Sequence, residues 1–166
     1  MDTPRQDSAH LRLPQDAVEA FAHAEAARDQ GRLEDAARLF GRSATIWGAA
    51  GWVFHAADAY VELGAILLFQ GRVGLLPELA FRVIALLEND PLPPGSRIKL
   101  AVYAHLMRNG AADQGAYFSF VHELRRHRKA REEHEEAPAH PAAHGEIPDN
   151  PLVSWITALN ERLSNS

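Results

Sequence analysis

Apolar residues recur along this chain at the three- and four-residue spacing of amphipathic α-helices. Such runs lie between residues 16 and 30, 33 and 47, 52 and 70, 77 and 87, 96 and 109, and 113 and 124. The runs at 52–70 and 77–87 are apolar on more than one side, which indicates that they are the most buried. No stretch alternates Val, Ile, Thr or aromatic residues with polar ones, so strands are not expected. The pattern therefore predicts an all-α protein.

Glycines divide these runs into pairs. Gly31, Gly71 and Gly110 each follow one run and precede another, and they are 40 and 39 residues apart. A fixed period of about 20–50 residues is the sequence signature of repeat proteins. The segment 48–51 ends the second run, and the Pro-rich segment 89–95 cannot remain helical and predicts a connecting loop. These breaks predict three helical hairpins.

The residues at these positions resemble the tetratricopeptide repeats, a family of stacked helical hairpins with small residues where helices cross. The resemblance rests on Leu63, Gly64, Leu67, Gly71 and Arg72 in the second pair, and on Ala20, Ala24, Ala27, Gly31, Ala36, Phe40 and Ser43 in the first. It implies three antiparallel helical hairpins stacked as a right-handed superhelix. Beyond the repeats, an apolar stripe at 152–163 predicts a C-terminal helix. Small residues let helix axes approach, and the aromatic residue fills the gap between hairpins.

The chain departs from the family pattern in two ways. Its period is about 40 residues, where the family has 34, which implies longer helices or longer loops. In the third pair, Gly115 and Ser119 stand where the family has an alanine and an aromatic residue. The resemblance covers residues 16–124, and an irregular bundle of Ala-rich helices is the alternative fold.

The segments on either side of the repeats differ in composition. We expect a flexible N-terminus at 1–13, the repeat domain at 14–136, a linker rich in Pro and His at 137–149, and an amphipathic helix at 150–166. The basic stretch 125–131 and the acidic stretch 132–136 predict either a solvated helix with ion pairs or a basic docking patch. The last helix either caps the stack in cis or joins a second copy as a homodimer.

Composition narrows the classes of partner and location. The 166 residues carry 17 basic and 22 acidic side chains, a net charge of −5, which argues against nucleic acid as the main partner. There is no cysteine, so disulfides and thiolate sites are excluded. The sequence shows neither an apolar signal core at its start nor a run long enough to cross a membrane. We therefore expect a cytoplasmic protein that binds no membrane.

Catalytic and metal-binding patterns are weak. His122 and His127 flank a segment that resembles a zinc-protease helix, but they are five residues apart, whereas a shared helix face needs four. The segment 48–51 lacks the Lys and the Ser or Thr of a phosphate-binding loop. We therefore expect no enzyme activity, no metal and no cofactor. A metal-binding bundle, an enzyme or a sensor with His122, His127 and His134 as ligands, is the alternative.

The predicted function is that of a noncatalytic module, an adaptor, co-chaperone or regulator that binds a protein or peptide on the concave face of the stack. A second alternative is a secretion chaperone of the tetratricopeptide class. If the first helix of each hairpin lines that face, as the resemblance implies, the binding residues are Phe21, Glu25, Arg28, Asp58, Leu68, Phe69, Arg97, Met107 and Arg108. Arg28, Arg97 and Arg108 are expected to meet acidic groups of the partner.

Overall fold

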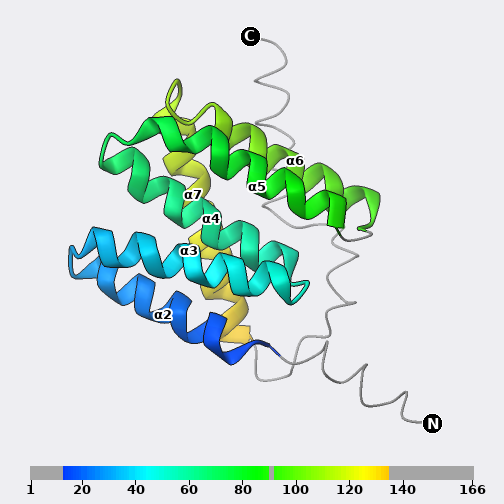
Figure 1. Ribbon diagram of the computed structural model, residues 1–166, viewed down its shortest axis with the longest axis horizontal. Helices are drawn as coiled ribbons and strands as arrows, with labels where there is room; N and C mark the ends of the chain where they lie inside the picture. Colours follow the sequence, from blue (N-terminus) through cyan, green and yellow to red (C-terminus); the bar gives the residue numbers. More distant parts are fainter. Residues whose placement is uncertain (1–12, 90–91, 135–166) are drawn as a thin grey trace.

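The computed structural model describes residues 13–89 and 92–134, which form six α-helices and one 3-10 turn with no strand (Figure 1). The helices are α2 (Gln15–Asp29), α3 (Leu33–Ala49), α4 (Val53–Phe69), α5 (Leu76–Asn89), α6 (Pro94–Arg108) and α7 (Gln114–His134), and the turn η1 is Val73–Leu75. The all-α prediction is confirmed. The expected linker, the C-terminal helix with its proposed dimer contact, and the expected flexible N-terminus, except for Leu13, lie outside the described residues.

Glycines end three of the helices through their backbone conformation. Gly31, Gly51 and Gly71 have φ angles of 76°, 82° and 74°, in the left-handed region that is costly for other residues. At the first of these ends, the amide of Arg32 donates to the carbonyl of Ala27 at 2.8 Å, and Gly31 donates to Arg28 at 3.0 Å. The same pair of hydrogen bonds recurs after α3 and α4, so each helix closes with a Schellman motif.

Small residues bring α2 and α3 close together. The buried face of α2 consists of four alanines, Ala17, Ala20, Ala24 and Ala27. Their short side chains leave room for α3 to approach, and the buried hydroxyl of Ser43 donates to the carbonyl oxygen of Ala17 at 2.9 Å. Phe40 of α3 is fully buried and packs edge-on against Phe21, with ring centroids 5.2 Å apart.

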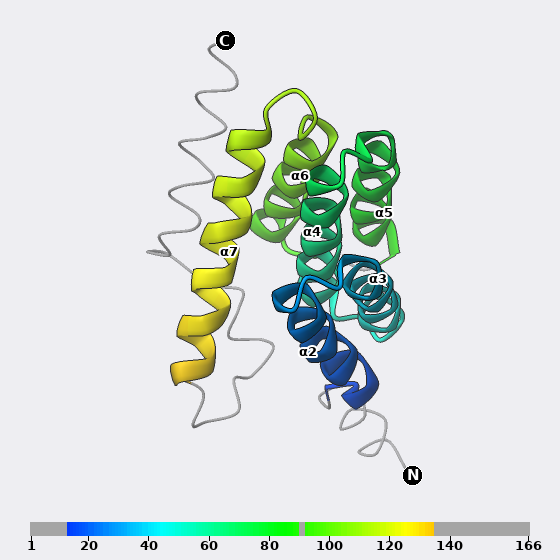
Figure 2. The ribbon, with the colours of Figure 1, turned by 90° about the vertical axis from the view of Figure 1, so that its left-hand side faces the viewer.

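The helices are arranged in three layers, with α4 at the centre. In Figure 2, α2, α4 and α6 lie between α3 and α5 on one side and α7 on the other. Helix α4 contacts α3, α5, α6 and α7. Thirteen of its residues are buried, as predicted for the run at 52–70. The run at 77–87 is less buried than predicted, since Phe81 of α5 is 68% exposed.

The third pair of helices differs from the expected hairpin. α6 packs mainly on α5, and α7 contacts α4 more extensively than it contacts α6. The apolar stripe of α7, Tyr117, Phe120, Val121 and Leu124, is buried in one cluster with residues of both α4 and α6. The contacts that favour α4 are the hydrogen bonds from Tyr117 to Val61 and from Arg125 to Glu62. α7 therefore lies against the layer of α2, α4 and α6, which is the face that the sequence assigned to a bound peptide (Figure 2).

Candidate functional site

The first half of α7 is fixed on α4 by a buried tyrosine. The Tyr117 ring is fully buried, and its hydroxyl donates to the carbonyl oxygen of Val61 at 2.7 Å. Two glycines make room for the ring: a Cβ at Gly64 would overlap the hydroxyl oxygen, and one at Gly110 would lie 3.2 Å from Cδ2. Burial, with a smaller contribution from the charge of Glu62, raises the pKa of Tyr117 well above 10.0, so the hydroxyl stays a donor.

The second half of α7 is held at a buried carboxylate, Glu62 of α4, whose side chain is only 1% exposed. Arg125 binds it in a bidentate manner, with Nε at 2.8 Å from Oε1 and Nη2 at 2.7 Å from Oε2. Arg128 donates to Oε1 at 2.5 Å, and Arg28 of α2 donates to Oε2 at 2.9 Å. The carboxylate therefore accepts four charge-assisted hydrogen bonds and connects three helices.

The arginines decide the ionisation of Glu62. Burial alone would raise the pKa of its carboxyl, but the hydrogen bond from Arg125 and the positive charges of Arg128, Arg125 and Arg28 outweigh burial. The pKa of Glu62 therefore lies below its ordinary value of 4.5, and the group is ionised at neutral pH. The hydrogen bond to Glu62 in turn raises the pKa of Arg125 above its ordinary value, against the effect of its own burial.

Aromatic rings and two further acids surround the three arginines. The guanidinium of Arg128 lies 5.1 Å from the centroid of the Phe21 ring, a cation–π contact. Arg28 also pairs with Asp29 at 3.2 Å and with Glu25 at 3.8 Å. Together with Glu62, these acids balance the three positive charges. The cluster is therefore a structural ion network and carries no excess charge that would bind an anion.

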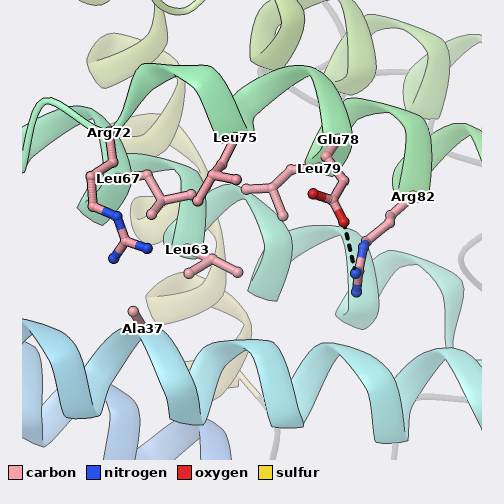
Figure 3. Close-up of a pocket in the computed structure, with 8 residues that line it drawn as sticks. All are labelled: Ala37, Leu63, Leu67, Arg72, Leu75, Glu78, Leu79 and Arg82. Carbon is pink, nitrogen blue, oxygen red and sulfur yellow. Dashed lines mark hydrogen bonds and ion pairs between the residues drawn. The ribbon is translucent and has the colours of Figure 1, made fainter.

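A shallow cleft lies on the opposite side of the molecule, between α3 and α5 (Figure 3). It encloses about 220 Å³ and is lined by Ala37, Leu63, Leu67, Arg72, Leu75, Glu78, Leu79 and Arg82. Its floor is aliphatic, and its rim carries an ion pair in which Arg82 Nη2 lies 3.0 Å from Glu78 Oε1. The lining offers neither a nucleophile with a neighbouring base nor a set of metal ligands. The cleft can accept an apolar side chain, but it has no catalytic arrangement.

The structure places the nine predicted binding residues in three different settings. Phe21, Glu25 and Arg28 lie together on α2, at the ion network that holds α7. Leu68, Met107 and Asp58 are buried, at 4%, 0% and 6% exposure. Phe69, Arg97 and Arg108 are exposed, the two arginines close to opposite ends of α6. The predicted set is therefore not one open surface, because α7 covers part of the expected face and the core takes up another part.

The structure also tests part of the expected chemistry. Among the described residues, no three His, Asp or Glu side chains are grouped to hold a metal ion. His122 is exposed and His127 is half-buried on α7, whereas the side chain of His134, the third ligand of the metal alternative, lies outside the described part. In the ranges 13–89 and 92–134, no helix combines the length and the apolar character needed to span a bilayer.

Phe21 and Arg28 at this site were among the predicted binding residues, whereas Glu62, Arg125 and Arg128 were not. Glu62 and Asp58 are the two acidic residues of α4, a helix that is otherwise mostly apolar. A carboxylate on a helix that is buried all round needs a cationic partner, so Glu62 was a detectable signal. Its partners Arg125 and Arg128 are 63 and 66 residues further along the chain, in a run of basic residues that is typical of a solvated helix surface, so the pairing could not be predicted from local sequence.

Comparisons with known proteins give no further information. No protein-family model, curated protein or solved structure matches this chain.

Proposed function

We propose that the protein is a noncatalytic protein-binding module of the tetratricopeptide-like kind, which holds a helical segment of a partner on the face formed by α2, α4 and α6. The observation that carries this proposal is α7 itself. A helix of 21 residues lies against that layer, held by an apolar stripe and by arginines on a buried carboxylate. A face that accommodates one amphipathic helix within the chain has the shape and the charge to accommodate another.

Two further features support binding rather than catalysis. Each ionised side chain at the buried site has a partner of opposite charge, since Glu62 accepts from three arginines and Arg28 also pairs with Asp29, although Nη1 of Arg128 is buried without a hydrogen-bond partner. None of these groups is left as a general base or a nucleophile beside an open cavity. Helices ended by Schellman motifs and packed through alanines form a rigid scaffold, as expected of a stacked hairpin protein.

The function is tested by screening a display library of amphipathic helical peptides against the full chain. We expect the chain to retain helices with dissociation constants in the micromolar range, and we expect Phe21→Ala to weaken the retained helices at least tenfold, because Phe21 is the ring on which Arg128 of α7 stacks. Phe81→Ala is the matched control, because it removes the same side chain from α5, where Phe81 is 68% exposed.

Two results of the screen would contradict the proposal. If no helix is retained by the wild-type chain or by a variant with α7 loosened, protein binding on this face is wrong. If helices are retained but bind equally well to Phe21→Ala, the partner uses another surface, with the cleft between α3 and α5 as the first candidate.

A further inference from the structure

The two halves of α7 are held by different kinds of contact. Up to Leu124, the helix buries four large apolar side chains against α4 and its neighbours. Between Arg125 and Ala130 the only apolar side chain is Ala130, and it is exposed. This second half is attached instead through Arg125 and Arg128 at Glu62.

The ionic attachment is the weaker of the two. The side chains of Arg125 and Arg128 are 39% and 13% exposed, so water competes for part of their hydrogen-bonding capacity. Segments with few buried apolar contacts open locally at a lower free energy than the core does. The second half of α7 can therefore open while its first half stays in place, and opening uncovers Phe21, Arg28 and Glu62.

The Glu62 carboxylate, once uncovered, determines the chemistry of the group that can take the place of Arg125 and Arg128. Three of the four hydrogen bonds to Glu62 come from Arg125 and Arg128, so opening leaves only the bond from Arg28. A Glu62 carboxylate that has lost three of its hydrogen bonds, beside the ring of Phe21, favours a guanidinium, because this group is planar and can donate to both carboxylate oxygens at once. A lysine donates from a single nitrogen and cannot reproduce the bidentate contact.

We propose that the second half of α7, residues 125–134, is an internal ligand that yields its place to an arginine-bearing amphipathic helix of a partner protein. The partner helix carries two arginines one turn apart, at the spacing of Arg125 and Arg128, beside apolar residues. One arginine meets Glu62, and the other stacks on Phe21. This inference rests on the proposed function and specifies the chemistry of its partner.

The first experiment measures binding of a labelled peptide with the sequence of residues 121–134 by fluorescence anisotropy. The full chain is compared as wild type and as Arg125→Ala/Arg128→Ala, whose own α7 no longer competes for Glu62. We expect the peptide to bind this variant at least tenfold more tightly than wild type. A peptide in which both arginines are alanine should bind at least tenfold more weakly.

A matched control removes the same charge from the outer side of the same helix. Arg126→Ala/Lys129→Ala alters two exposed side chains, of which Arg126 pairs only with Glu123 among the described contacts. It should bind the peptide as weakly as wild type does. Equal binding to all three proteins, or equal binding of the arginine-free peptide, overturns the inference while leaving helix binding in the library screen intact.

A second experiment follows the opening itself. Because the chain has no cysteine, spin labels can be attached at chosen positions, here at Ala26 on α2 paired with either Lys129 or Ser119 on α7. In Arg125→Ala/Arg128→Ala the distance distribution of the pair at 129 should broaden, whereas that of the pair at 119 should not. Unchanged distributions overturn the proposal, and so does broadening of both pairs. A wild-type dimer that is lost in this variant overturns it too, by assigning the site to a second copy of the chain.

Discussion

Replacing Gly64 with alanine should destabilise the protein, although alanine is the better helix former. A methyl group at this position would overlap the Tyr117 hydroxyl oxygen and would lie 3.1 Å from Cζ of that ring and 3.3 Å from Cδ2 of Leu76. The tyrosine would have to move away from Val61, to which it donates its buried hydrogen bond. Since Tyr117 anchors the first half of α7, the substitution tests the packing of the whole helix on α4.

Three contributions set the magnitude. The gain in helix propensity is about 1 kcal/mol. Overpacking of a filled interior costs about 1–3 kcal/mol, and a buried hydroxyl left without its acceptor costs about 1–3 kcal/mol. The central values leave a net loss of about 3 kcal/mol. For a domain of this size, that loss lowers the melting temperature by roughly 10–15 °C.

Urea unfolding followed by circular dichroism measures this loss, with Gly41→Ala as the matched control. Gly41 also lies within a helix, but the nearest atom to its Cβ would be Cδ2 of Leu63 at 3.8 Å, so only the propensity gain remains. Tyr117→Phe should cost stability in the wild type, yet restore part of it in the Gly64→Ala background, because it removes the overlapping oxygen. A Gly64→Ala protein as stable as the Gly41→Ala protein would refute the reasoning.

Three other substitutions give independent checks by the same unfolding assay. Glu62→Gln should lose about 2–3 kcal/mol at pH 7, less than for a fully buried pair because the arginines partly reach water. Since the pKa of Glu62 is lowered in the folded state, its contribution is complete above about pH 4.5 and is lost progressively as the pH falls through the folded-state pKa. The difference in stability between wild type and Glu62→Gln should therefore shrink below pH 4.5, and a constant difference would contradict the assignment. Ser43→Ala should lose about 1 kcal/mol with the buried bond to Ala17, and an unchanged midpoint would show that the bond contributes nothing net. Gly31→Ala should lower the free energy of unfolding by about 1–2 kcal/mol, because a φ of 76° is strained for alanine. No atom lies within 4 Å of the added methyl group, so the loss would come from the backbone alone. An increase in stability would mean that the turn adopts another backbone conformation in the variant.

The helices and most of their ends could be predicted from local sequence. Gly31 and Gly71 ended helices where the apolar runs stopped, since a left-handed C-terminal residue is a local requirement that glycine satisfies. Gly110 was also placed correctly in the turn between two helices, but for a different reason. Its φ is not positive, and a Cβ there would press on the Tyr117 ring, so this glycine serves a close approach between segments.

The path of α7 could not be predicted in the same way. Periodicity identified its apolar stripe, but the stripe alone does not say whether α6 or α4 receives it. That choice depends on the space beside Gly64 and on the partner of Glu62, both of which bring together residues more than 50 positions apart. The repeat pattern predicted that α7 pairs with α6, the helix before it, whereas the contacts with α4 determine its position in the structure.

The separation of these contacts along the chain has a consequence for synthesis. Val61 precedes Tyr117 by 56 residues, and Glu62 precedes Arg125 by 63, whereas Arg28 precedes Glu62 by only 34. As the polypeptide emerges from the ribosome, Glu62 therefore meets Arg28 first, and its layer stays open until the arginines of α7 have been made. For that interval the growing chain exposes the surface that α7 will later cover, and an amphipathic helix of another protein would meet no competition from α7 there.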